Sequence, residues 1–271
     1  MPSKSWKEYD FAMSANLKFK STPVRERVSK EEWEVRVDLA ACYQLGAIYK
    51  WTDLIYTHFS ARVPGTEDFL LNPYGLMFDE ITASSLVKVD WEGKILDDPL
   101  GMGVNEAGFV IHSCMHAARP EINCVIHTHT RAGVAVSAMK CGLLPISQHA
   151  MMVQADITYH DYEGIALYKD EQQRMAADLG KTSKAMILRN HGLLALGETV
   201  RAAFEVMYYL DAACQIQIDA CAGGMHNVHL MSDQAANTAS TQFKREGRPA
   251  HHKDWPALLR LLDRKKIPYR D

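Results

Sequence analysis

The chain has 271 residues, of which 47% are hydrophobic, and a formal net charge of -3. This length accommodates one large domain or two small ones, and the apolar content suffices for a sizeable core. The weak charge and the scattered basic residues argue against nucleic acid or an anionic membrane surface as a partner. No apolar run approaches the 18 residues of a membrane-spanning helix, so the sequence predicts no membrane partner.

The six cysteines contain no CxxC pair, and most of them lie in apolar surroundings such as Ile122-Asn123-Cys124-Val125. The first residues, Met1 to Lys7, lack the apolar stretch of a secretory signal. We therefore expect reduced thiols and a cytoplasmic protein.

The first half of the chain predicts an N-terminal arm followed by mixed helices and strands. Residues 1–28 are polar and irregular, and Ser29 precedes Glu32 by three residues, as in a capping box. A helix should run from there to about Tyr49. The next predicted elements are strands over 54–63 and 69–71, a short helix over 82–86, and a hairpin with strands at 87–89 and 94–96.

The second half predicts an alternation of helices and strands. The expected helices cover 106–118, 131–139, 170–179 and 200–221, and the expected strands cover 124–129, 185–189 and 193–196. We expect one α/β domain over 29–225. The tail, 226–271, carries an amphipathic piece over 255–262 and should pack on the domain or on a neighbouring subunit.

Three histidines stand at positions that suit a metal. His127 and His129 close an apolar run, and in a strand they would point to the same face. His191 lies in a predicted tight turn, Asn190-His191-Gly192, in which the glycine could supply a positive φ. Three imidazoles on rigid elements suit a first-row divalent metal and leave one position open for substrate or water.

Eight segments, in this order and spacing, resemble the class II aldolase/adducin family, and several are most similar to the adducin head domain. They include Leu71-Asn72-Pro73-Tyr74-Gly75, Val104-Asn105-Glu106, Val125-Ile126-His127-Thr128-His129 and Arg189-Asn190-His191-Gly192. The resemblance covers about residues 30–225. It implies α/β/α layers around a mostly antiparallel central sheet, in a homotetramer.

The resemblance also implies a metal site and a set of substrate contacts. It assigns His127, His129 and His191 to a divalent metal, zinc first, with iron, manganese or cobalt as alternatives. The positions that correspond to substrate-binding parts of the family, or that lie near them, are His58, Asn72, Tyr74, Gly75 and His149.

Several positions depart from the sugar-phosphate aldolases of this family. Gly108 stands where those enzymes carry a metal-binding and proton-transferring glutamate, and Glu106 is the nearest carboxylate. The phosphate-binding Ser-Ser pair falls on Glu106 and Ala107, and other phosphate-site positions fall on His58 and Tyr74. A carboxylate would repel a phosphate, so the substrate should be unphosphorylated.

The general base is left open among several side chains. Glu106 is the first candidate for the catalytic role, and its structural alternative is an exposed acid favoured by the helix dipole. The further candidates are His149, His160 and Asp161.

Three functions remain at this point. The first is a metal-dependent lyase that cleaves or decarboxylates a small unphosphorylated carbonyl compound through a metal-stabilised enolate. The second is an Fe(II)-dependent oxygenase acting on an α-keto acid or a phenol. The third is a non-catalytic, adducin-like oligomerisation module. Retention of all three histidines favours an enzyme, and the expected partners are a small substrate and further copies of the chain.

Overall fold

The computed structural model describes residues 22–164, 169–244 and 251–271. Its helices are α1 (Val24–Arg27), α2 (Lys30–Ile48), α3 (Glu106–Ala118), α4 (Arg131–Ser137), α5 (Gln148–Met151), α6 (Lys169–Leu179), α7 (Val200–Cys221), α8 (Asp233–Lys244) and α9 (His251–Arg264). Its strands are β1 (His58–Arg62), β2 (Phe69–Leu71), β3 (Val87–Val89), β4 (Ile95–Asp97), β5 (Cys124–Thr128), β6 (Ile157–His160), β7 (Ala185–Leu188) and β8 (Gly192–Gly197).

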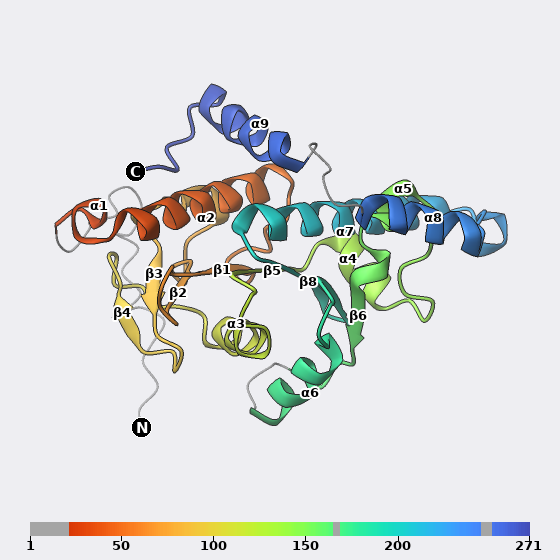
Figure 1. Cartoon of the computed structure of the whole chain (residues 1–271), viewed down its shortest axis with the longest axis horizontal. Coiled ribbons are helices and arrows are strands. Elements are labelled where there is room, and N and C mark those ends of the chain that lie inside the picture. Colours follow the sequence, from red (N-terminus) through yellow and green to blue (C-terminus); the bar gives the residue numbers. More distant parts are fainter. Residues whose placement is uncertain (1–21, 165–168, 245–250) are drawn as a thin grey trace, which may run out of the picture.

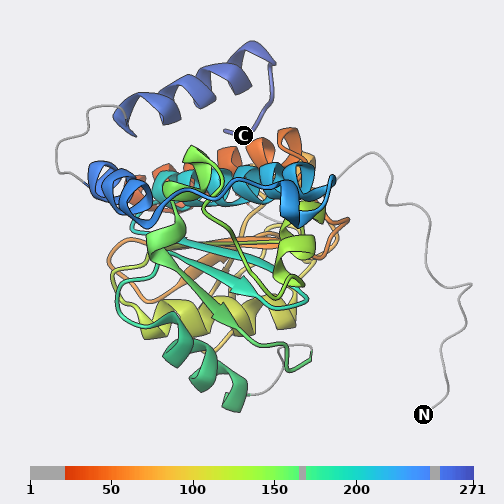
Figure 2. The ribbon, with the colours of Figure 1, turned by 90° about the vertical axis from the view of Figure 1, so that its right-hand side faces the viewer.

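The strands form one sheet in the order β4-β3-β2-β1-β5-β8-β7-β6. All neighbours are antiparallel except β6 and β7, which are parallel. Helices α2 and α7 cover one face of the sheet, and α3 and α6 cover the other (Figures 1 and 2). The predicted α/β/α layers around a mostly antiparallel sheet are therefore confirmed.

Alternation along the central strands divides the core between the two faces. Ile126 of β5 and Leu193 of β8 belong to the cluster that includes residues of α2 and α7. Val125 and Leu194, their neighbours in sequence, belong to the cluster that includes residues of α3 and α6. Because both faces are covered, these strands are apolar on both sides and hold the functional residues on a rigid support.

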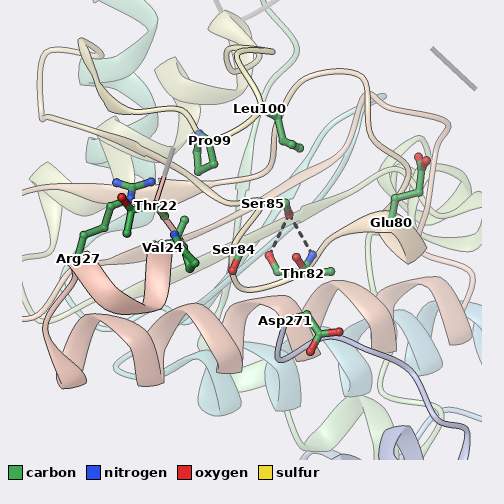
Figure 3. Close-up of a pocket in the computed structure, with 11 residues that line it drawn as sticks. Thr22, Val24, Arg27, Glu80, Thr82, Ser84, Ser85, Pro99, Leu100 and Asp271 are labelled. Atoms are coloured by element: carbon green, nitrogen blue, oxygen red, sulfur yellow. Dashed lines mark hydrogen bonds between the residues drawn. The ribbon is translucent and has the colours of Figure 1, made fainter. Parts of the chain in front are cut away.

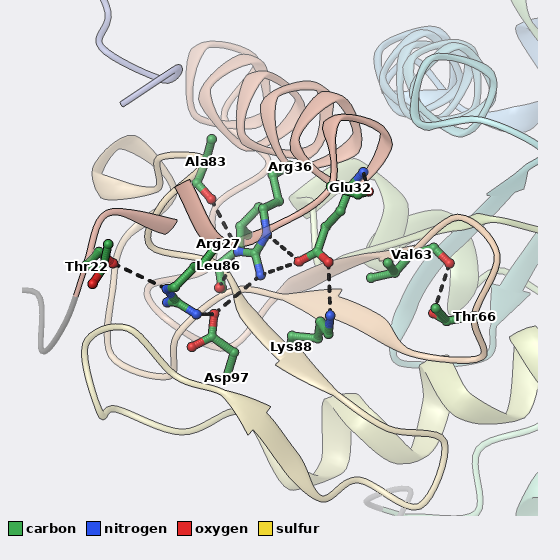
Figure 4. A network of polar contacts seen from close by, with 11 residues as sticks. Thr22, Arg27, Glu32, Arg36, Val63, Thr66, Ala83, Leu86, Lys88 and Asp97 are labelled. Atoms are coloured by element: carbon green, nitrogen blue, oxygen red, sulfur yellow. Dashed lines mark hydrogen bonds and ion pairs between the residues drawn. The ribbon is translucent and has the colours of Figure 1, made fainter. Parts of the chain in front are cut away.

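The first long helix is tied to the edge of the sheet by a buried ionic network (Figure 4). Ser29 caps α2 by accepting a hydrogen bond from the Glu32 amide. Glu32 in turn pairs with Arg36 at 2.9 Å and with Lys88 of β3 at 2.9 Å. The Arg36 guanidinium is fully buried and also donates to the Leu86 carbonyl oxygen at 2.9 Å. The network therefore joins α2 to β3 through charges that are paired inside the protein.

The C-terminal segment returns to the domain. Trp255 of α9 donates from Nε1 to Asp38 Oδ1 of α2 at 3.1 Å and packs against Phe204 of α7. Beyond α9, the Tyr269 and Asp271 carbonyl oxygens accept hydrogen bonds from two main-chain amides in the 82–85 turn. This segment borders a cavity of about 380 Å³ (Figure 3).

Three local predictions were wrong in detail. The strand predicted over 54–63 begins only at His58, because Leu54 lies in a turn with φ of +49°. The helix predicted over 82–86 is a turn, closed by Ser85 Oγ, which accepts from the Thr82 amide and donates to its carbonyl oxygen. Residues 22–28 of the predicted arm contain α1, and 1–21 lie outside the described residues.

Two bulk properties bear on the sequence predictions. In the described part of the chain, no helix combines the length and the apolar character needed to cross a membrane. The six cysteines are free, and four of them are buried.

Candidate metal centre

The three histidines meet at one end of the central strands. His127 lies in β5, His129 follows that strand by one residue, and His191 lies in the turn between β7 and β8. Strand β8 pairs with β5, with Thr128 opposite Leu193, so the turn that carries His191 lies beside the end of β5. One ligand atom from each histidine lies within 4.8 Å of the others, as the sequence pattern predicts for a shared site.

The Asn190-His191-Gly192 turn is made differently from the expectation. Asn190, not the glycine, adopts the left-handed conformation, with φ of +56°. Gly192 is required for space, because a Cβ there would lie 2.4 Å from the Thr128 carbonyl oxygen. The glycine thus lets the turn approach β5 closely enough to bring His191 to the other two imidazoles.

Hydrogen bonds on the far side of two rings fix which nitrogen faces the site. His127 Nδ1 lies 3.1 Å from the Leu193 carbonyl oxygen, and His129 Nδ1 lies 2.9 Å from Asp53 Oδ2. Both partners are acceptors, so each Nδ1 carries a hydrogen, and the neutral form of each ring then has its lone pair on Nε2.

The Nε2 atoms of the three histidines converge on one point. His129 Nε2 lies 2.8 Å from His127 Nε2 and 3.0 Å from His191 Nε2. Facing lone pairs repel one another unless a cation lies between them. A tetrahedral ion with bonds of about 2.1 Å holds its ligand nitrogens about 3.4 Å apart, so a shift of a few tenths of an ångström would admit one. The donor set therefore fits a divalent metal.

The surroundings favour the neutral form of two of these imidazoles, His127 and His191. Burial, followed by the neighbouring histidines, holds the pKa of His127 well below its ordinary value. Burial, followed by His129, lowers the pKa of His191 to about 4. Both shifts favour the uncharged form, which is the form that binds a metal.

Asp53 is a site residue that the sequence did not predict. Its carboxylate holds His129, and it lies in the turn after Trp51, whose indole Nε1 donates to Asp211 Oδ2 of α7 at 3.1 Å. Carboxylate partners of this kind orient a ligand histidine and raise its basicity. Asp53 lies 76 positions from His129, and no motif in the sequence marks it.

Further polar groups border the centre near His191. Tyr162 is 55% exposed and meets the His191 ring edge-on at 6.2 Å between centroids. A cavity of about 10 Å³, room for one water molecule, lies between His191, His160 and Asp161. His160 and Asp161, two candidates for the general base, thus lie near the ligand histidines. His160 Nδ1 is held by Asp178 Oδ2 at 2.7 Å.

Glu106, the carboxylate predicted to be catalytic, does not lie on the side of its helix that faces the protein interior. Glu106 is exposed in the first turn of α3, after the N-cap Asn105. The position that faces inward is Gly108, where an added Cβ would lie 2.6 Å from the His58 ring. His58, a predicted substrate-binding residue, is opposite His127 in the β1–β5 register, with ring centroids 5.0 Å apart.

The other four predicted substrate-binding residues are dispersed. Asn72 is buried and accepts from the Tyr43 hydroxyl at 2.8 Å. Tyr74 is 39% exposed in the turn after β2, and Gly75 beside it has φ of +116°. His149 lies at the start of α5 and contacts Tyr209 of α7. Asn72 and His149 thus contact Tyr43 and Tyr209, and not the three histidines of the candidate site.

The 380 Å³ cavity lies elsewhere and contains none of these histidines (Figure 3). Its wall is made by α1, the 80–85 segment, the 99–100 loop and Asp271. Donor chemistry, not cavity size, therefore locates the candidate site.

The chain belongs to the class II aldolase and adducin family. Residues 37–218 match the family described as Class II Aldolase and Adducin N-terminal domain. Members of this family generally depend on a divalent metal, are oligomeric and act on small molecules.

Relatives of this chain include both aldolases and an adducin. An aldolase II superfamily protein from Pseudomonas syringae has a TM-score of 0.89 and 53% identity, over 92% of this chain and all of that one. L-fuculose 1-phosphate aldolase from Glaciozyma antarctica has a TM-score of 0.77 and 27% identity, over 94% and 98%. Mouse alpha-adducin is 43% identical over 89% of this chain, but only 35% of the adducin is covered.

Proposed function

We propose that this protein is a divalent-metal-dependent enzyme that acts on a small unphosphorylated carbonyl compound, by aldol-type C–C cleavage or decarboxylation. The observation that carries the proposal is the convergence of three imidazole Nε2 atoms. His127, His129 and His191 would hold the ion. When bound, it would supply Lewis acidity that polarises a carbonyl group.

Two features at the start of α3 support an unphosphorylated substrate. The first amides of a helix are a common phosphate site. Here the Asn105 side chain already accepts from the Ala107 and Gly108 amides, at 3.1 and 3.3 Å. The Glu106 carboxylate adds a negative charge at the same end of the helix. A phosphate would have to displace the cap and approach a like charge.

The chain's own groups supply the remaining roles. Asp53 orients His129. Glu106 is the candidate general base that the sequence indicates first. We expect the bound metal to be zinc. We also expect the protein to form a homotetramer. The free cysteines favour a reducing compartment such as the cytoplasm.

The test is the metal content of the full chain purified without oxygen. A variant with His127→Ala and His191→Ala serves as the site-deficient protein, and His226→Ala, which removes an exposed histidine of the short 3-10 helix Met225–Asn227, is the matched control. We expect one zinc per chain in the native protein and in His226→Ala, and none in the double variant, with an unchanged sedimentation coefficient.

Other results would select the alternatives. Stoichiometric iron bound at the same residues would favour the oxygenase. A chain that takes up no metal, even after reloading, would favour the assembly module, for which the likeness to alpha-adducin is the specific support. Full metal content in the double variant would contradict the three-histidine site.

A further inference from the structure

A buried chain of polar groups runs from the metal centre into the layer between the sheet and α3. His58 and Ser60 lie two residues apart on β1, so they share one face. His112 and His116 lie one turn apart on α3 and face them. None of the four residues is more than 4% exposed.

The contacts form an unbranched series. His58 Nδ1 lies 2.7 Å from His112 Nε2, and His112 Nδ1 lies 2.5 Å from Ser60 Oγ. Ser60 Oγ lies 2.9 Å from His116 Nε2. His116 Nδ1 ends the series at the Ile122 carbonyl oxygen, 2.9 Å away.

The three imidazole rings in this hydrogen-bonded series are neutral. All three rings are buried, which disfavours the charged form of an imidazole, and this burial lowers the pKa of His116 to about 4. The pKa of His112 is also well below its ordinary value, again chiefly through burial. Each ring therefore carries a single N–H, and its two nitrogens have opposite hydrogen-bonding roles.

The terminal carbonyl then decides the direction of every bond. The Ile122 oxygen can only accept, so His116 carries its hydrogen on Nδ1 and its Nε2 accepts from the Ser60 hydroxyl. Ser60 Oγ accepts from His112 Nδ1, and His112 Nε2 accepts from His58 Nδ1. The one arrangement that satisfies all four contacts leaves His58 Nε2 without a hydrogen.

That nitrogen belongs to a ring that lies beside the candidate metal centre. The ring of His58 is 5.0 Å from the ring of His127, centroid to centroid. Its Nε2 and Cδ2 pack over Gly108, where an added Cβ would be 2.7 and 2.6 Å from them. Among the described residues Nε2 has no hydrogen-bond partner, and it is not fully enclosed. His58 is not in the group of ligand atoms that lie within 4.8 Å of one another.

We propose that His58 is the hydrogen-bond acceptor of this site, presenting a bare Nε2 to a hydroxyl or water of the bound substrate. His112, Ser60 and His116 are positioning residues that set its tautomer. The ligand that His58 would contact rests on the proposed function, whereas the tautomer of His58 does not depend on it. It adds a selectivity: beside the three histidines the site favours a substrate group that donates a hydrogen bond, and a second carbonyl oxygen there would face a lone pair.

The test is the tautomer of His58 in the full chain, labelled with ¹⁵N-histidine and measured by long-range ¹H–¹⁵N correlation. In the metal-free native protein we expect Nδ1 protonated and Nε2 bare for both His58 and His116. The Ser60→Ala substitution interrupts the series of hydrogen bonds, and the His58 signals should then move towards a mixture of tautomers. Ser85→Ala, which removes a buried hydroxyl in the 82–85 turn, is the matched control and should leave His58 unchanged.

Each other outcome is decisive. A native His58 with its hydrogen on Nε2, or a Ser60→Ala spectrum in which His58 is unaltered, would overturn the inference. On adding zinc, the Nε2 signals of the three ligand histidines should shift strongly and that of His58 weakly. A His58 Nε2 that shifts like a ligand would make it a fourth ligand and not an acceptor. Failure to bind zinc would count against the proposed function, and the metal-free spectrum would still decide the tautomer.

Discussion

The Asp53 carboxylate lies 2.9 Å from His129 Nδ1, across 76 positions of sequence. It fixes the tautomer of His129 and aims Nε2 at the other two histidines. It does so from a loop whose Trp51 is anchored to α7 and not from the strand that carries the histidine.

Replacing this carboxylate should weaken metal binding without removing it. We expect Asp53→Ala to bind zinc about 10- to 100-fold less tightly, because the imidazole loses its orientation and part of its basicity. Competition with a chromophoric chelator measures the affinity. Asp68→Ala, an acid on the turn before β2, is the control. Equal affinities in the two variants would show that Asp53 does not serve the site.

The turn that carries His191 depends on the absence of a side chain at Gly192. We expect Gly192→Ala to cost about 1–3 kcal/mol of stability and to weaken zinc binding, because its Cβ would meet the Thr128 carbonyl oxygen at 2.4 Å. Urea unfolding and the same chelator assay measure both effects. Gly223→Ala is the control, since the nearest atom to its Cβ is 3.9 Å away. A Gly192→Ala protein with native affinity would show that the turn tolerates displacement.

Replacing one partner of the buried ion pair in α2 should lower the stability of the protein. Glu32→Gln removes the nearer of the two carboxylates that pair with the fully buried Arg36 guanidinium and leaves Asp97 at 3.7 Å, and we expect a loss of about 3 kcal/mol in the free energy of unfolding. Glu34→Gln removes an exposed acid from the same helix, 3.8 Å from Lys30, and should change stability by less than about 1 kcal/mol. Similar losses in the two variants would contradict a special role for the buried pair.

The buried histidines should make the metal-free protein sensitive to acid. The pKa of His116 is about 4 in the folded chain, mainly through burial, against about 6.5 when unfolded. Between these values the unfolded state binds the extra proton, so stability is complete above about pH 6.5 and falls as the pH drops towards 4. The pKa values of His58 and His112 are shifted in the same direction and add to the loss.

His116→Gln should reduce this slope by about one proton, which urea unfolding at a series of pH values would show. His226→Ala, at an exposed position, should leave the slope unchanged. A variant with the native slope would place the acid sensitivity in other groups.

The sequence by itself determined the long helices α2, α3, α6 and α7 and named the three candidate metal-binding histidines. The patterns over Glu106–Ala118 and Val200–Cys221 gave the bounds of α3 and α7, because periodic burial and capping are local properties. His127 and His129 could be placed on one face from the period of a strand. The place of His191 beside them followed from the resemblance to a known family.

Only the tertiary structure decided how the site is supported. Asp53 reaches His129 from a distant loop, and the β1–β5 register sets His58 opposite His127. The direction of the buried chain depends on a single carbonyl, that of Ile122, six residues beyond His116. Such contacts join residues far apart in sequence or set by strand register, and no local periodicity carries them. The physical reason is that a hydrogen-bond donor or acceptor is assigned by its spatial neighbours and not by its place in the chain.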